Sequence, residues 1–280
     1  MLIDAQTRLL ALLGHPVNHS LSPRMHNAAL AHLGLKAVYI AFAPPPSRVP
    51  EAVRGLLALG CGGWNVTAPY KRVCAELADV LKGPAEALGT VNTMLHDGSR
   101  LVGYNTDVGG LRRAWKEHQV EEGQHLMVLG RGGAARAVVW AACQLGLSVT
   151  VAARSPIDDL LVAVRKHFIR AETTWCPWPE RQGKASSVQI VVNATPMDSP
   201  LDADCLSPHQ LVCDLVYGHE PTSWLRAAGN RGCKVMDGRE LLLYQGAEAF
   251  SLFTGHEAPM AVMRGALYGG ACDVTLSHSR

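Results

Sequence analysis

The stretch LMVLGRGGAARAV at residues 126–138 decides the fold, because it places a glycine-rich turn between an apolar strand and a helix. Gly130, Gly132 and Gly133 allow the backbone to approach a ligand closely, and the free N–H groups at a helix start attract negative charge. This order is typical of the turn that binds the pyrophosphate of a dinucleotide. The glycine spacing is G-x-G-G rather than G-x-G-x-x-G, so an ordinary tight turn is the alternative.

The end of the next strand indicates which dinucleotide binds. Sites that select NAD usually carry Asp or Glu about 20 residues after the glycines, where the carboxylate binds the ribose 2′-hydroxyl. Here the strand leads into Ala153, Arg154 and Ser155, with no carboxylate. A guanidinium matches the geometry of a 2′-phosphate and can stack on adenine. The sequence therefore predicts NADP as the cofactor, and a surface arginine without a ligand is the alternative.

Short apolar runs alternate with segments of helical period along the whole chain of 280 residues. This alternation predicts an α/β protein with a largely parallel sheet, and the length suits two domains. We expect Ser22 to cap the first helix. The expected strands are 8–13, 37–42, 64–66, 91–95, 101–102, 125–129, 148–152, 189–192 and 211–216. The expected helices are 23–33, 47–59, 71–81, 108–118, 134–145, 157–168, 222–230, 239–253 and 260–272.

The composition argues against several classes of protein. Lys plus Arg number 26 and Asp plus Glu number 24, without a basic run, so we expect no nucleic-acid partner. The amino terminus lacks a signal-peptide pattern, and no run of about 18 apolar residues occurs, so we expect no membrane span. The eight cysteines form no CxxC pair and lie at no metal-ligand spacing. They predict reduced thiols, no metal and a cytoplasmic location.

Four polar clusters lie in the first half, at residues 14–23, 65–71, 89–93 and 103–107. Each falls at a strand end or in a loop, where an open α/β sheet forms its ligand crevice. The clusters supply many short hydrogen-bonding side chains together with one lysine, Lys71, and one aspartate, Asp107. Such a set suits a polyhydroxylated, anionic small molecule.

These four clusters together resemble the shikimate dehydrogenase family. The resemblance continues through residues 130–136, the Asn-Ala-Thr at 193–195, the Asp-Leu-Val-Tyr at 214–217, the Asp-Gly at 237–238 and the Gln-Gly-Ala at 245–247. It implies an open α/β substrate domain at 1–107 and a Rossmann-like NADP domain at 108–238. The C-terminal helices at 239–280 are expected to pack back onto the substrate domain.

The resemblance also implies a reaction, the reversible NADPH-dependent reduction of 3-dehydroshikimate to shikimate in aromatic amino-acid biosynthesis. It implies Lys71 as the catalytic residue, with Asp107 as its partner. A positioned lysine can donate the proton that a reduced ketone oxygen needs, or stabilise the developing charge. The substrate ligands implied are Ser20, Ser22, Thr67, Asn92, Tyr217 and Gln245. The cofactor residues implied are Gly130, Arg131, Gly132, Gly133, Ala134, Arg154, Ser155, Thr195, Leu215 and Gly238.

Several positions depart from the family pattern. Arg131 stands where a small residue is usual, and Ala153 replaces the asparagine that often precedes the cofactor arginine. Pro196 directly follows Thr195 without the usual Gly-Met, and Glu240 is expected near the nicotinamide side of the crevice. The paired Ser20 and Ser22 favour shikimate over quinate, although either serine alone could cap the following helix.

Other functions stay open from the sequence. One is a quinate or aminoshikimate dehydrogenase that uses NAD. A second is a non-catalytic sensor of shikimate-like ligands, which the retained Lys71 and Asp107 argue against. A third is a folate-linked dehydrogenase, which the substrate clusters argue against. A monomer or a homodimer is expected.

Overall fold

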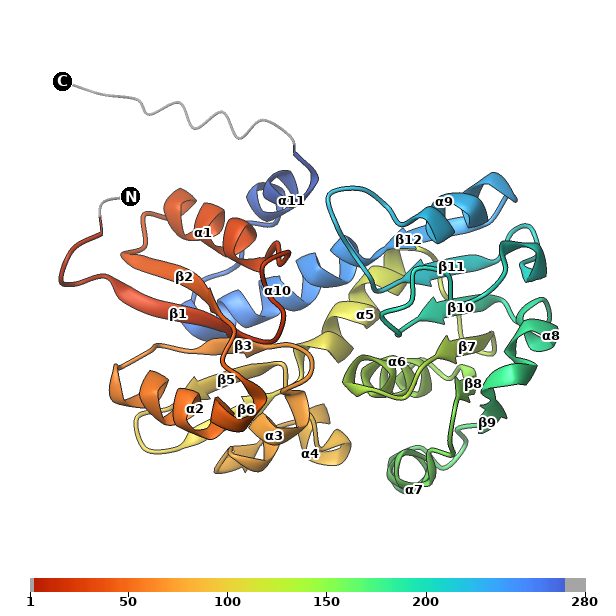
Figure 1. Cartoon of the computed structure of the whole chain (residues 1–280), viewed down its shortest axis with the longest axis horizontal. Helices are drawn as coiled ribbons and strands as arrows, with labels where there is room; N and C mark the ends of the chain where they lie inside the picture. The colour runs from red at the N-terminus through yellow and green to blue at the C-terminus, as the bar shows by residue number, and fades with distance from the viewer. Residues whose placement is uncertain (1–2, 270–280) are drawn as a thin grey trace.

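The computed structural model describes residues 3–269, which form two α/β units side by side, each with its own six-stranded sheet (Figure 1). The strands of the first unit are β1 (Arg8–Leu13), β2 (Ala37–Phe42), β3 (Trp64–Val66), β4 (Val80–Leu81), β5 (Thr93–His96) and β6 (Leu101–Tyr104). Its helices are α1 (Ser22–His32), α2 (Val49–Ala58), α3 (Lys71–Glu76) and α4 (Pro84–Leu88), with a 3-10 turn at Pro46–Arg48. The predicted α/β class is confirmed.

The first sheet is mixed rather than largely parallel. Its strand order is β2-β1-β3-β5-β6-β4, and β5 runs antiparallel to both of its neighbours. The start of β5 therefore lies at the same edge of the sheet as the ends of β1, β3 and β6. This reversal matters for function, because Asn92, just before β5, joins the polar residues that follow the other strands.

The second unit contains a fully parallel sheet of order β12-β11-β10-β7-β8-β9. Its strands are β7 (His125–Leu129), β8 (Ser148–Ala153), β9 (Thr173–Pro177), β10 (Ile190–Asn193), β11 (Leu211–Asp214) and β12 (Lys234–Asp237). Its helices are α6 (Gly133–Gln144), α7 (Asp158–His167), α8 (Arg181–Ala185) and α9 (Ser223–Asn230), with 3-10 turns at Trp178–Glu180 and Ala203–Cys205. Apolar clusters pack on both faces of the sheet, as a parallel sheet requires.

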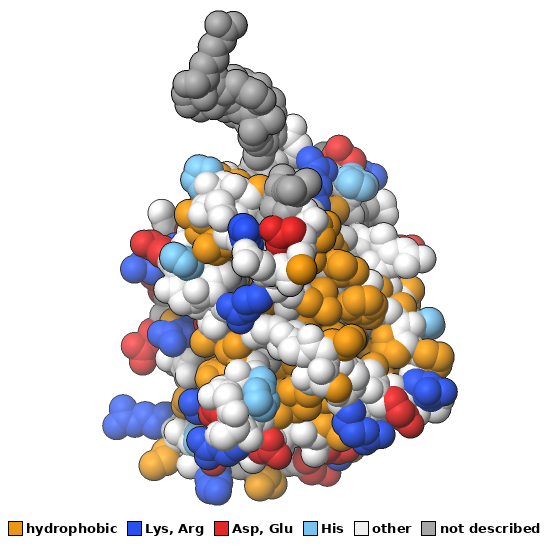
Figure 2. All heavy atoms as spheres, turned by 90° about the vertical axis from the view of Figure 1, so that its left-hand side faces the viewer, with side chains coloured by type: hydrophobic (Ala, Val, Ile, Leu, Met, Phe, Trp, Pro, Cys, Tyr) orange, Lys and Arg blue, Asp and Glu red, His pale blue; other side chains and the backbone are white. Residues whose placement is uncertain are grey.

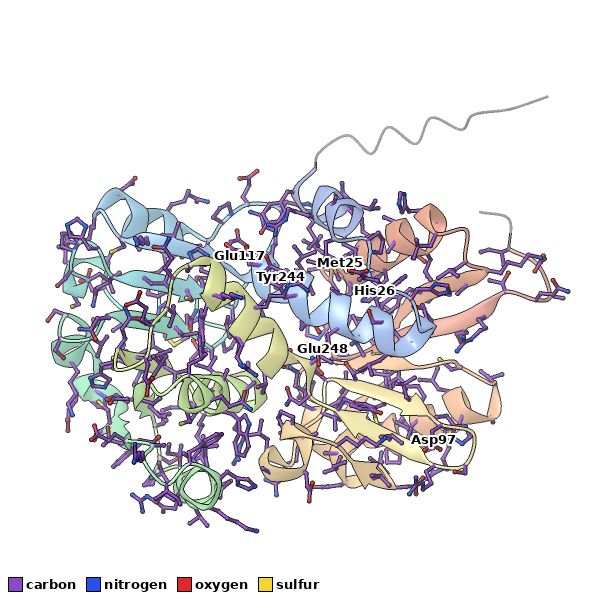
Figure 3. The ribbon with its side chains drawn as sticks, turned by 180° about the vertical axis from the view of Figure 1, so that it is seen from behind. Met25, His26, Asp97, Glu117, Tyr244 and Glu248 are labelled. Carbon is purple, nitrogen blue, oxygen red and sulfur yellow. The ribbon has the colours of Figure 1, made fainter. Side chains whose placement is uncertain are left out.

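Two long helices, α5 (Thr106–Glu117) and α10 (Gly238–Thr254), run between the units and pack along each other. Gly110 of α5 lies against the backbone of α10, since a Cβ built there would be 2.8 Å from the Gln245 nitrogen. At the far end the Tyr244 hydroxyl donates a hydrogen bond to Glu117, and the two side chains lie close together in Figure 3. The packed helices α5 and α10 thus join the two units.

Helix α10 continues into the first unit, where α11 (Met260–Tyr268) and α1 complete a shared core. His26 of α1 is fully buried in this core and stacks on Tyr39, with 4.3 Å between ring centroids (Figure 3). The predicted return of the C-terminal helices to the first unit is therefore observed as far as Tyr268. The rest of the helix predicted at 260–272 lies outside the described residues.

One end of the first unit carries exposed apolar side chains. Ile40 and Phe42 lie on the edge strand β2, and Leu33 follows α1. Figure 2, which views the molecule from that end, shows apolar side chains gathered on its surface. Within residues 3–269 no helix is both long and apolar enough to cross a membrane.

Several predicted elements were wrong in extent. The helix predicted at 71–81 ends at Glu76, because the chain turns to form β4, which pairs with β6. Strands β9 and β12 were not predicted; they are the two edge strands of the second sheet, each paired on one side only. Ser22 does not cap α1: the helix begins at Ser22 itself, whose N–H donates to Ser20 Oγ at 3.3 Å.

We predict that Gly110→Ala destabilises the protein by about 1–3 kcal/mol, because the new methyl group would overlap the α10 backbone. Gly183→Ala is the matched control, since Gly183 lies in a helix with open space around its Cβ position. The control should be neutral or slightly stabilising. Urea unfolding of the three proteins measures the difference. Equal stability of the two variants would show that the close helix contact is no constraint.

Candidate functional site

A cavity of about 480 Å³ opens between the two units, at the edge where β1, β3 and β6 end. All eight residues predicted from the sequence as catalytic or substrate-binding line this cavity. They are Ser20, Ser22, Thr67, Lys71, Asn92, Asp107, Tyr217 and Gln245. Ligands of an open α/β sheet bind in such a crevice.

The centre of the cavity is an ion pair between the Lys71 ammonium and the Asp107 carboxylate. Lys71 begins α3 and Asp107 lies in the first turn of α5, so the pair joins two segments 36 residues apart. Their side chains are only 16% and 8% exposed. A shielded pair interacts more strongly than one in water. Asn105 is the N-cap residue of α5, so Asp107 lies inside the first turn and does not cap the helix.

Asn92 organises the polar groups around this pair. Its side-chain NH2 group donates to Asp107 Oδ1 at 2.8 Å and to Gln245 Oε1 at 3.1 Å, and its side-chain oxygen Oδ1 accepts from the Thr106 N–H at 2.7 Å. Asn92 is 2% exposed, and buried polar groups of this kind are normally all paired. One amide thus fixes side chains from β5, α5 and α10 relative to one another.

A second buried asparagine, Asn65, supports the first. The side-chain NH2 group of Asn65 donates to the backbone carbonyl of Asn92 at 3.1 Å and to Thr93 Oγ1 at 3.0 Å. Its side-chain oxygen accepts from the Tyr39 hydroxyl at 2.7 Å. Sequence analysis placed Asn65 in a polar cluster without assigning it a role. Its position at the cavity wall depends on strand pairing between β3 and β5, which the sequence does not display.

The loop after β1 contributes the opposite wall. Ser20 and Ser22 line the cavity together with His15 and His19, two histidines that sequence analysis did not select although they lie in the same loop. Burial raises the pKa of the nearby Tyr217 hydroxyl, a hydrogen bond with Ser20 lowers it, and the charge of Asp107 raises it further. Tyr217 therefore faces the cavity as a neutral hydroxyl at physiological pH.

The second cavity, of about 790 Å³, follows the carboxyl ends of β7, β8, β9 and β10. Six of the predicted cofactor residues line it, namely Gly130, Arg131, Gly132, Arg154, Ser155 and Thr195. Three others, Ala134, Leu215 and Gly238, line the first cavity, and Pro196 lines both. The structure thus brings the predicted cofactor residues to one continuous edge. Trp178 also lines this cavity and was not selected from the sequence.

The glycine turn between the cavities fits a pyrophosphate. Gly130 has a φ of +116°, and a Cβ there would lie 3.0 Å from the Ala194 oxygen. Helix α6 begins without a side-chain cap, so its first N–H groups are left for a ligand, and no atom lies within 4 Å of a Cβ at Gly132. A twelve-residue helix with a free N-terminus attracts phosphate charge.

Lys71 connects the two cavities. A Cβ at Gly133 would lie 3.1 Å from Cδ of Lys71, so the lysine stem of the first unit lies against the start of α6 in the second unit. A side chain larger than glycine at position 133 would push the lysine away. Lys71 therefore lies between the first cavity, which it lines, and the start of α6, whose preceding residue Gly132 lines the second cavity.

Two buried residues, Asn193 and Asp214, hold the loops that follow β10 and β11. Asp214, at the end of β11, accepts hydrogen bonds from Asn193 at 2.9 Å and from Thr222 at 2.6 Å. Asn193 in turn accepts from the Thr195 hydroxyl at 2.7 Å. The hydrogen bond between Asn193 and Asp214 therefore links the motifs at 193–195 and 214–217. It fixes the direction in which the chain continues from β10 to Thr195 and from β11 to Tyr217.

Glu240 does not lie near the crevice as predicted. Its carboxylate pairs with His118 at 2.9 Å, at the junction of α5 and α10, and it is absent from the residues that line either cavity. The hydrogen bond that His118 donates to Glu240 raises the pKa of His118, although partial burial opposes the increase. The position of His118 at the C-terminal end of α5 also favours a positive charge. Glu240 therefore stabilises the packing of α5 against α10 and does not belong to the site.

Two family models match the chain. The shikimate dehydrogenase substrate-binding domain matches residues 12–94, and the shikimate 5′-dehydrogenase C-terminal domain matches residues 238–268. The first match covers the loop after β1 and the polar residues around β3 and β5. The second match covers α10 and α11.

Curated and solved relatives extend over nearly the whole chain. A shikimate dehydrogenase (NADP(+)) of Moorella thermoacetica is 41% identical over 93% of this chain and 92% of its own. The Thermus thermophilus shikimate 5-dehydrogenase, solved with NADP(H) and shikimate, has a TM-score of 0.82 at 36% identity, covering 93% of this chain and 98% of its own. A quinate dehydrogenase of Corynebacterium glutamicum in complex with NAD has a TM-score of 0.85 at 29% identity, covering 94% and 99%.

We predict that the His118–Glu240 pair stabilises the folded state more at about pH 6 than at about pH 9. A raised histidine pKa stabilises the folded state fully below the unfolded value of 6.5, and the contribution is lost as pH rises through the folded value. Glu240→Gln should therefore destabilise the protein by on the order of 1 kcal/mol at about pH 6 and by less at about pH 9.

Thermal unfolding at the two pH values measures this effect, with the exposed Glu121→Gln as the matched control. A loss of stability in Glu240→Gln that stays constant between the two pH values would contradict the assigned charge on His118.

Proposed function

The chain belongs to the shikimate dehydrogenase family, and from this premise we propose that its two cavities are the substrate and cofactor sites of one ketone reduction. The enzyme reduces 3-dehydroshikimate to shikimate with NADPH, and the reaction is reversible. The single observation that carries the assignment of residues is the Lys71–Asp107 pair, held by Asn92 at the junction of the two cavities.

Reduction of a ketone requires hydride at carbon and a proton at oxygen. Bound NADPH supplies the hydride. The Lys71 ammonium donates the proton to the ketone oxygen, or in the reverse direction the Lys71 amine takes the proton of the substrate hydroxyl. The lysine then exchanges its proton with solvent. Because Lys71 contacts Gly133 at the start of α6, its ammonium lies where substrate and cofactor meet.

Asp107 orients the lysine rather than donating a proton itself. One of its oxygens accepts from Lys71 and the other from Asn92. A carboxylate with both oxygens engaged cannot rotate away, so the ammonium keeps one direction throughout the reaction.

The remaining cavity residues match the functional groups of shikimate. Ser20, Ser22 and Tyr217 offer hydroxyl groups for the carboxylate, and Thr67, Asn92 and Gln245 can bind the ring hydroxyl groups. The retained serine pair and the 41% identical shikimate dehydrogenase favour shikimate over quinate as the substrate. A preference for quinate with NAD is the second candidate, which the 29% identical quinate dehydrogenase supports less strongly.

The cofactor site compensates for the asparagine that Ala153 replaces. Arg131 donates a hydrogen bond to Ser155, so its guanidinium lies beside the end of β8, next to Arg154. Two arginines and one hydroxyl then surround the place where a 2′-phosphate would bind. Guanidinium groups are well suited to bind phosphate, which favours NADP over NAD.

The domain division and setting are part of the same proposal. Residues 3–107 together with 239–269 form the substrate unit, and residues 108–238 form the cofactor unit; the two sheets support this division. The ends of the predicted division, 1–2 and 270–280, lie outside the described residues. The seven cysteines among the described residues are free thiols, which agrees with a cytoplasmic location. We propose a monomer or a homodimer.

We predict that Lys71→Ala lowers kcat about 100-fold to 10,000-fold while the KM for 3-dehydroshikimate changes little. The lysine transfers the proton, whereas other residues provide most of the binding. NADPH oxidation measures the rate, and calorimetry measures shikimate binding. Lys82→Ala, at an exposed lysine of the same unit, is the control and should be active. An unchanged kcat with a strongly raised KM would make Lys71 a binding residue instead.

We predict that Arg154→Ala and Arg131→Ala each weaken NADP binding about 10-fold to 100-fold and NAD binding much less. The difference arises because only NADP carries the 2′-phosphate. Titration of both cofactors against each variant measures the effect, with the exposed Arg165→Ala as the control. Equal losses for the two cofactors would remove both arginines from the 2′-phosphate site.

A further inference from the structure

Trp178 is an aromatic residue of the cofactor cavity that the sequence motifs do not include. It begins the 3-10 turn directly after β9 and lines the cavity together with Arg154 and Ser155. The pairing of β8 with β9 places Ala153 opposite Pro177, so the residues that follow the two strands lie side by side. The indole therefore stands next to the arginine assigned to the 2′-phosphate.

Arg181 holds the indole in place. Its guanidinium carbon lies 4.2 Å from the centre of the Trp178 ring. The guanidinium also donates to the Pro200 carbonyl and to the Trp178 carbonyl, each at 2.8 Å. A cation over an aromatic face is attractive, and the two backbone contacts prevent the arginine from swinging away. One face of the indole is thus covered by Arg181. The half-buried side chain also packs in part against the apolar core of the second sheet, and its accessible part lines the cavity.

A fixed aromatic surface beside a phosphate-binding arginine suits one kind of chemical group. The adenosine 2′-phosphate half of NADP carries a planar base and a phosphorylated ribose a few bonds apart. Aromatic side chains bind nucleic-acid bases by stacking, since every base has a flat π face. Neither the glycine turn nor the two arginines supplies an aromatic surface for that base.

We propose that Trp178 stacks on the adenine of NADP and that Arg181 is the positioning residue that fixes the indole. This inference rests on the proposed function, since it assigns the adenine end of the same cofactor site. The nicotinamide end, at Lys71 and Gly133, is not involved.

The test uses adenosine 2′,5′-bisphosphate, which contains the adenine half of the cofactor alone. Calorimetric titration of the whole protein should show binding weakened about 10-fold to 100-fold in Trp178→Ala. Trp178→Phe should stay within about threefold of the wild type, because phenylalanine keeps an aromatic face. Arg181→Met should give an intermediate loss. Shikimate binding serves as the folding control and should be equal in all four proteins.

Tryptophan fluorescence provides a readout that a merely structural role would not change. Adenosine 2′,5′-bisphosphate should quench the wild-type fluorescence, and the quenching should be lost in Trp178→Phe although that variant still binds. Equal binding by Trp178→Ala and the wild type, or quenching that persists in Trp178→Phe, would overturn the proposal.

Failure of the proposed function would look different. A wild-type protein that binds adenosine 2′,5′-bisphosphate but does not oxidise NADPH with 3-dehydroshikimate would refute the reaction and leave the stacking of Trp178 intact. A wild-type protein that does not bind the bisphosphate at all would refute both.

Discussion

The close contact of α5 with α10 at Gly110 is the constraint on which the rest of the structure depends. Only a residue without a side chain lets the backbone of Gln245 come so near. At this separation the Gln245 side chain reaches Asn92, and Asn92 reaches Asp107. A wider spacing would pull α10 away from the polar centre. The same two helices join the two sheets. The close contact at Gly110 therefore fixes both the arrangement of the two units and the position of the site residues on α10.

The residues of the site come from segments that lie at the ends of different strands. The antiparallel direction of β5 brings Asn92 to the edge where β1, β3 and β6 end. Lys71 then extends from the first unit to Gly133 of the second. The substrate cavity carries many short polar side chains among apolar ones, whereas the cofactor cavity combines the glycine turn with Arg131, Arg154 and Trp178. This difference follows from what each must bind, a hydroxylated ring in one case and a long phosphorylated ligand in the other.

Much of the fold and site could be predicted, and the exceptions have physical reasons. The strands 8–13, 37–42, 64–66 and 125–129 were predicted to the residue, because buried apolar runs with clear turn signals around them leave little choice. β4, β9 and β12 were missed; all three are edge strands, whose place is decided by pairing with a single neighbouring strand. The predicted site residues line the two cavities apart from Gly133, which lies against Lys71. Glu240 was misplaced because proximity in sequence to Gly238 does not fix the direction of a helical side chain.

The sequence by itself determined the α/β class, the glycine turn, the arginine at the end of β8 and the polar residues that mark the family. These are local features, set by residue type and short spacing. Only the tertiary structure decided that Asn65 supports Asn92, that Arg131 bonds Ser155, that Glu240 pairs with His118 and that Trp178 enters the cofactor cavity. Each of these depends on which strands and helices lie side by side, and contacts between residues distant in the chain leave no pattern in a single sequence.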